Sequence, residues 1–179
     1  MPGTAYDAKG LLLSAIEDPN PVIFFEHSNL YSQKSDVPEE EYFIPLGKAD
    51  LKHEGDACTI VSWSYSLPHA MRAANDLEKE GINVDLVDIR TISPLDMDTI
   101  LASVKKTHRL LIVHEAVKQG GFGSEIAARV AEEAIEYVDA PIMRIGAPFA
   151  PVPFTPPLVK AYYHDKHTII NKVKELIAY

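Results

Sequence analysis

The chain has 179 residues, with 17 Lys or Arg against 26 Asp or Glu, so its formal net charge is −9. This acidic balance argues against nucleic acid or an anionic membrane as the main partner. No apolar run approaches the roughly 18 residues that a membrane span requires. The proportions of hydrophobic and charged residues, 46% and 24%, are those of a globular protein. Cys58 is the single cysteine, which excludes an internal disulfide and suits a reducing compartment such as the cytoplasm.

The first 45 residues predict one helix, one strand and a linker. Apolar residues recur at helical spacing within 8–17, and the proline-containing turn that follows ends the helix. Residues 22–25 (VIFF) are typical of a short buried strand, whereas 27–45 contain Ser, Asn, Pro and an acidic run, which indicate a linker. One helix and one strand cannot make a sheet. We therefore expect this part to dock on another surface or to be the end of a further domain.

From about residue 46 onward, predicted strands and helices alternate. The predicted strands are an edge segment within 47–55 and the runs 58–63, 84–89, 110–113 and 142–145. The predicted helices carry apolar stripes within 67–77, 97–104, 126–137 and 169–177. Five prolines within 148–157 predict an irregular segment. The alternation predicts an α/β fold of three layers, a mostly parallel sheet with helices on both faces.

The clearest candidate for ligand binding is the edge where the strand 110–113 ends. His114 and Glu115 lie at the carboxyl edge, where α/β sheets bind ligands, but neighbouring strand residues point to opposite faces and form no catalytic pair. Gly120–Gly123 follows and opens a helix, so its backbone N–H groups could face an anion. A tight turn capped by Ser124 is the favoured interpretation of this loop. Ser66 is a candidate N-cap for the helix 67–77. No complete active site emerges.

A second candidate is the end of the first helix, Ala15–Asn20. A helix end leaves carbonyl oxygens without intrahelical partners. A turn that gathers these oxygens can hold a hard monovalent cation without a cage of carboxylates. On chemistry alone, an ordinary C-cap is the favoured interpretation.

Eight stretches in order along almost the whole chain resemble one family. It is the beta subunit of the thiamine-diphosphate-dependent, decarboxylating component of 2-oxo acid dehydrogenase complexes. These complexes include the pyruvate, branched-chain 2-oxo acid and acetoin enzymes, and the component is part of the transketolase-like superfamily. The stretches are DAKGLL (7–12), AIEDPNPVIFFEH (15–27), IPLGKA (44–49), VDLVDIRTISPLD (84–96), SVKKTHRLLIVHEA (103–116), GGFGSEIAA (120–128), DAPIMRIGAP (139–148) and PVPF (151–154). Each stretch alone is weak evidence, but eight in the right order are strong.

The resemblance implies a division of the chain at about residue 46. Residues 1–45 match the last helix and strand of a pyrimidine-binding domain plus a linker, and 46–179 match the transketolase-type C-terminal domain. In the family, the glutamate that activates the thiamine ring and the catalytic histidine belong to the part that is not in this chain. The separate alpha subunit holds the diphosphate and Mg²⁺. The resemblance therefore assigns no catalytic and no cofactor-binding residue to this chain.

One metal site of the family does map here. The beta subunit of the family binds a potassium ion, and the surroundings of that ion are similar to the end of the first helix here. In this chain Ala15, Ile16, Asp18 and Asn20 would supply the oxygens. The resemblance makes this site and an ordinary C-cap equally good interpretations.

The resemblance also implies partners: an alpha subunit, a second beta subunit and the subunit-binding domain of the dihydrolipoyl acyltransferase. Phe149, Phe154, Tyr162 and Tyr163 are candidates for an apolar self-association surface, and Tyr179 for contact with the acyltransferase. The implied role is assembly within an oxidoreductase that converts a 2-oxo acid to an acyl-lipoyl group, while this chain alone is expected to be inactive. The alternatives are a stand-alone, non-catalytic α/β binding module and another transketolase-like enzyme.

Overall fold

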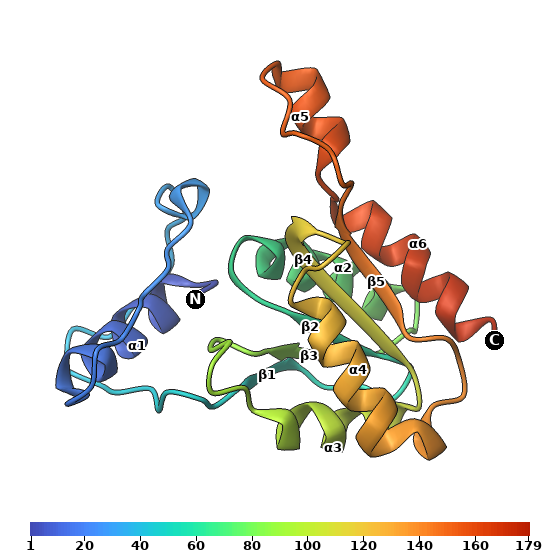
Figure 1. Cartoon of the computed structure of the whole chain (residues 1–179), viewed down its shortest axis with the longest axis horizontal. Coiled ribbons are helices and arrows are strands. Elements are labelled where there is room, and N and C mark those ends of the chain that lie inside the picture. Colours follow the sequence, from blue (N-terminus) through green and yellow to red (C-terminus); the bar gives the residue numbers. More distant parts are fainter.

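A five-stranded sheet forms the centre of the computed structural model, which describes all 179 residues (Figure 1). The strands are β1 (Asp50–His53), β2 (Thr59–Ser62), β3 (Asp85–Asp88), β4 (Leu110–Val117) and β5 (Met143–Ala147), in the spatial order β1-β3-β2-β4-β5. All neighbours pair in parallel except β1, which lies antiparallel to β3 at the edge. The predicted mostly parallel sheet is thus confirmed.

Helices cover both faces of the sheet, as predicted. They are α2 (Leu67–Lys79) and α6 (Lys166–Ile177) on one face, with α3 (Met97–Thr107) and α4 (Gly123–Ala134) on the other. Successive residues of the central strands enter opposite cores: Ile60 packs with α2 and α6, and Val61 with α3 and α4. A strand buried on both faces must be apolar at every position, which explains the continuous runs in the sequence. No helix is long and apolar enough to cross a membrane.

The N-terminal arm, residues 1–45, lies beside this domain (Figure 1). Its helix, α1 (Ala5–Glu17), starts three residues earlier than expected because Thr4 caps it, its hydroxyl accepting from the Asp7 N–H at 3.1 Å. The prediction of a buried strand at 22–25 is wrong. This segment pairs with no other strand, and Ile23 and Phe25 are 81% and 59% exposed. A strand needs a neighbour to bond with, and none lies beside this segment.

Three smaller expectations also fail. The proline-rich segment is only partly irregular, because α5 (Pro156–Tyr162) begins with two prolines, which the first turn of a helix tolerates. Figure 1 shows this helix projecting away from the sheet. Ser66 and Ser124 cap nothing with their side chains: Ser66 has helical dihedrals and an unpartnered hydroxyl, and Ser124 lies inside α4.

A buried group of charges joins the arm to the sheet edge. Asp7 of α1 has no exposed surface, and its carboxylate lies 2.8 Å from Lys52 Nζ and 2.6 Å from Arg90 Nη2. Asp50 contacts both cations at 2.7 Å. Burial by itself would raise the pKa of Asp7. Hydrogen bonds from Lys52 and Thr4 and the charges of Lys52 and Arg90 outweigh burial and hold that pKa below its ordinary value.

Replacing this carboxylate tests how firmly the arm is held. We expect Asp7→Asn to lower the free energy of unfolding by about 3 kcal/mol near neutral pH, because one partner of a buried ion pair is removed while the cations stay. Urea denaturation measures the change. Asp56→Asn is the matched control, since Asp56 is exposed and makes no side-chain hydrogen bond, and it should change stability little. Equal stability of the two variants would contradict this account.

Candidate functional site

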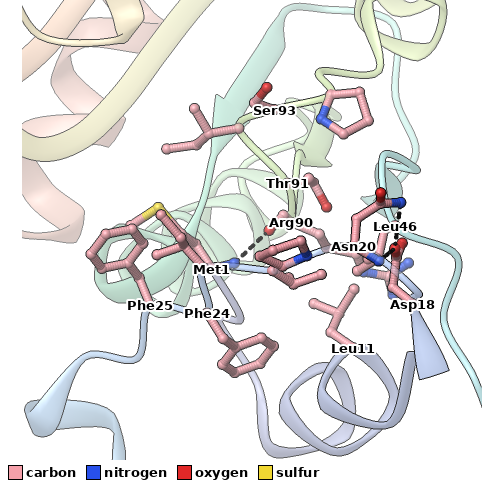
Figure 2. Close-up of a pocket in the computed structure, with 15 residues that line it drawn as sticks. Met1, Leu11, Asp18, Asn20, Phe24, Phe25, Leu46, Arg90, Thr91 and Ser93 are labelled. Atoms are coloured by element: carbon pink, nitrogen blue, oxygen red, sulfur yellow. Dashed lines mark hydrogen bonds between the residues drawn. The ribbon is translucent and has the colours of Figure 1, made fainter. Parts of the chain in front are cut away.

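A groove runs between the arm and the domain, and Figure 2 shows its lining. Its volume is about 740 Å³. Its walls are the arm residues Met1, Leu11, Asp18 and 20–25 and the domain residues Leu46 and 90–94. The Met1 ammonium donates to the Arg90 carbonyl at 2.7 Å and closes one side. We call this space the arm groove. Most of its side chains are apolar, so it offers contact area rather than catalytic groups.

The predicted cation site lies where the arm groove meets the end of α1 (Figure 2). Asp18 is the C-cap, and its N–H donates to the Ser14 carbonyl at 3.2 Å. The Asp18 carboxylate accepts from the backbone N–H of Asn20 at 2.8 Å and from its side-chain amide at 3.0 Å. These bonds hold residues 18–20 in a tight turn against the helix end.

The turn leaves carbonyl groups of the last helical turn without backbone donors. The Ala15 carbonyl would ordinarily accept from residue 19, which is proline and has no N–H. The Ile16 carbonyl would accept from residue 20, but the Asn20 N–H is already bonded to Asp18. The structure thus places Ala15, Ile16, Asp18 and Asn20 in one tight turn, where the carbonyl groups of Ala15 and Ile16 lack their usual helical donors.

At the carboxyl edge of the sheet, His114 is part of the core. Its ring is 1% exposed, stacks on Trp63 at 5.4 Å, and has no hydrogen-bond partner on either nitrogen. Glycines surround it so closely that a Cβ on Gly123 would lie 2.7 Å from Nε2. Burial lowers the pKa of His114. The ring, stacked on Trp63 and without a polar partner, packs as an aromatic group.

Glu115 points away from His114, as the strand geometry predicts. Its carboxylate lies 3.0 Å from Nε2 of His27 in the arm, and the His27 ring stacks on Tyr65 at 4.5 Å. His27 and Glu115 are 88 residues apart, and no local pattern in the sequence relates them. Neither this contact nor the charge group around Asp7 can therefore be predicted from the sequence.

The glycine loop forms a tight turn between β4 and α4. Gly120 has a φ of +70°, a left-handed conformation that favours glycine. Beside it, the Arg144 guanidinium donates to the Ser124 hydroxyl and to the Lys118 carbonyl. Ser124 thus accepts a hydrogen bond from a neighbouring strand instead of capping its own helix.

Other titratable groups near this edge are also structural. His69 and His164 face each other with ring centroids 6.1 Å apart, and burial lowers the pKa of both, that of His164 to about 4. Cys58 lies at the opposite, amino edge, directly before β2; it is fully buried, and burial raises the pKa of its thiol to about 12. Such a thiol packs as a small core residue.

Comparisons with known proteins show which families share this sequence and fold. The model of the transketolase C-terminal domain matches residues 47–169. The pyruvate dehydrogenase E1 component subunit beta of Bacillus subtilis (strain 168) is 49% identical over 87% of this chain and 48% of its own length. The acetoin:2,6-dichlorophenolindophenol oxidoreductase subunit beta of the same organism is 45% identical over 99% of this chain and 52% of its own length. A split-gene transketolase, solved as an inactive beta4 tetramer, superposes with a TM-score of 0.76 at 22% identity, over 99% of this chain and 56% of that one.

The chain belongs to the transketolase C-terminal domain family. Its resemblance to beta subunits of 2-oxo acid dehydrogenases is confirmed by the relatives, while the split-gene transketolase supports the fold alone. The chain spans about half the length of the curated relatives it matches.

The buried state of His164 predicts a pH dependence of stability. The folded pKa of about 4 is below the ordinary value of 6.5, so the unfolded chain binds the proton more tightly. We expect the contribution of this ring to be complete above about pH 6.5 and to decline as the pH falls towards about 4. Between about pH 7.5 and about pH 4.5, the free energy of unfolding should fall by about 1–2 kcal/mol less in His164→Gln than in the wild type.

Urea denaturation at the two pH values measures this difference. His167→Gln is the matched control, because His167 lies three residues further along, in the first turn of α6, and is exposed. A pH dependence that is the same in both variants would show that His164 does not carry this effect.

Proposed function

We propose that this chain is the C-terminal part of a 2-oxo acid dehydrogenase beta subunit and that its role is assembly rather than chemistry. The observation that carries the proposal is the identity of 45–49% to two named beta subunits, over nearly all of this chain but about half of theirs. These relatives favour the dehydrogenase over a stand-alone binding module or another transketolase-like enzyme. The proposed reaction of the whole assembly, in the cytoplasm, is oxidative decarboxylation of a 2-oxo acid to an acyl-lipoyl group.

The cofactors of that reaction are thiamine diphosphate and Mg²⁺, and we place both outside this chain. Mg²⁺ is bound by carboxylates together with phosphate oxygens and water. No three His, Cys, Asp or Glu side chains of this chain are grouped so that they could hold a metal ion. The residues present therefore do not fit the cofactor, and we assign them no step of the reaction.

The proposed division at residue 46 is supported by two observations. The family match begins at residue 47, and the domain that follows contains both hydrophobic cores, whose buried residues all lie beyond residue 57. The arm contains instead an extended apolar segment without a partner strand, at 22–25. Such a segment suits the end of a further domain, namely the proposed pyrimidine-binding domain.

We assign the exposed apolar surface to the proposed partners, an alpha subunit and a second beta subunit. Phe149 and Phe154 are 73% and 98% exposed, and clustered apolar surface of this kind is typical of interfaces. Tyr162 and Tyr163 are partly buried, and the Tyr162 hydroxyl donates to two carbonyls of the proline-rich segment. The two phenylalanines are therefore the better contact residues.

For the acyltransferase, we propose contact at the C-terminus. Tyr179 is 66% exposed, two residues beyond α6, so its ring is accessible. An exposed aromatic ring can supply buried area in contact with a small subunit-binding domain.

Reconstitution tests the proposed function. The purified chain alone is expected to show no decarboxylation of pyruvate or branched-chain 2-oxo acids with thiamine diphosphate and Mg²⁺. The chain is then mixed with the alpha subunit and the N-terminal half of the Bacillus subtilis pyruvate dehydrogenase beta subunit. This mixture should be more active than the same mixture without the chain. Release of CO₂ is the readout. Activity of the isolated chain, or no gain on mixing while all parts are folded, would contradict the proposal.

We further propose that Ala15, Ile16, Asp18 and Asn20 hold K⁺, supported by the unpaired carbonyls described above. Binding to the folded state alone stabilises a protein, so about 100 mM KCl in place of NaCl should raise the Tm by about 2–4 °C. Asn20→Ala should abolish this gain, since it removes the amide that bonds to Asp18. Asn75→Ala, exposed on α2, is the control that should keep it. Equal melting of the wild type in both salts would contradict the site.

A further inference from the structure

The order of the strands creates a crevice that the proposed function does not use. From β2 the chain crosses to β3 on one side, and from β3 it returns to β4 on the other side of β2. Open α/β sheets bind ligands outside the carboxyl ends of their strands, at the point where the strand order reverses. Here that point lies between β2 and β4. Their pairing ends at Ser62 and Val113, beyond which the two chain segments leave the ladder.

Two backbone irregularities open this edge further. The register of β4 against β5 shifts between Val113 and Val117, so residues 114–116 leave regular pairing, as in the bulges that re-aim side chains near binding sites. Directly after β2, Ser64 has a φ of +49° and is 6% exposed. A non-glycine residue in this conformation is strained, and such strain is concentrated at ligand sites.

A cavity of about 410 Å³ lies at this edge, and we call it the switch-point cavity. Its volume is within the usual range for sites that bind small molecules. The arm covers one side of it with Phe25 and His27. Its lining includes five aromatic side chains, which are Phe25, Trp63, Tyr65, Tyr162 and Tyr163.

The charge in the switch-point cavity is negative. Glu26 and Glu115 line it, whereas no Lys or Arg side chain does. Met1 also lines it, but the Met1 ammonium is bonded to the carbonyl of Arg90, which is not part of the lining. The carboxylate of Glu115 is partly buried, and its salt-bridge partner is an imidazole, that of His27, rather than a permanent cation. Tyr163 and Glu115 both line this cavity, and burial and the charge of Glu115 raise the pKa of the Tyr163 phenol. Aromatic faces beside a carboxylate attract cations and disfavour anions.

We propose that the switch-point cavity binds a small organic ammonium ion. The alkylated head would lie against the aromatic rings, and Glu115 would supply the counter-charge. The proposal is independent of the decarboxylase assembly, because every residue that carries it belongs to this chain.

Choline tests the site when it is compared with its uncharged carbon isostere, 3,3-dimethylbutan-1-ol. Titrations of the full chain, followed by calorimetry and by amide shifts of residues 64 and 116, should show choline binding about tenfold tighter than the alcohol. Glu115→Gln should weaken choline binding about tenfold and leave the alcohol unchanged. Glu132→Gln, exposed on α4, should alter neither.

A second variant keeps the test decisive if Glu115→Gln fails to fold. Tyr163→Leu removes one aromatic face from a partly buried position and should weaken choline binding at least threefold. Equal affinity for choline and the alcohol would overturn the proposal. So would the absence of choline binding by the folded wild type, or full choline affinity in the two variants.

Discussion

The carboxylate of Asp7 is the constraint on which the placement of the arm depends. A buried charge without a partner is very costly, so α1 can be buried only where Lys52 and Arg90 reach its carboxylate. Both cations stand at the sheet edge formed by β1 and the end of β3. Once α1 is fixed there, the following chain must cross the domain towards β4, where His27 meets Glu115. The arm groove and the switch-point cavity both follow from this docking.

The same charge group carries an internal conflict. Besides Asp7 and Asp50, it contains Asp88, whose carboxyl is fully buried and has one unpartnered oxygen. Burial and the nearby charge of Asp7 raise the pKa of Asp88 to about 7. Because this pKa is above that of the unfolded chain, Asp88 opposes folding increasingly as the pH rises from about 4 to about 7. Attachment of the arm is thus stabilised by Asp7 and weakened by its neighbour.

The sequence predicted the domain well because its signals are local. A strand buried on both faces is apolar throughout, as at 84–89, and a helix over a sheet has one apolar stripe. The same kind of signal failed at 22–25, because an apolar run indicates a segment suited to a sheet and not whether a neighbouring strand exists. The helix end alone favoured an ordinary C-cap, and the candidate cation site at Ala15–Asn20 was predicted only through the family resemblance. Contacts between Asp7 and Lys52, or His27 and Glu115, join residues 45 and 88 positions apart, which no periodicity relates.

Apolar side chains are buried in the sheet domain but exposed in the two segments attached to it, the arm and the region around α5. The sheet has a core on each face, and the largest side chains there are fully buried. Large exposed apolar side chains gather instead at the arm, with Ile23 and Phe25, and around α5, with Phe149 and Phe154. Neither segment can bury these side chains against the domain, because the arm is fixed by Asp7 and α5 projects from the sheet (Figure 1). Apolar surface of this kind outside the core is typical of contact with another polypeptide, and it distinguishes the two attachments from the domain itself.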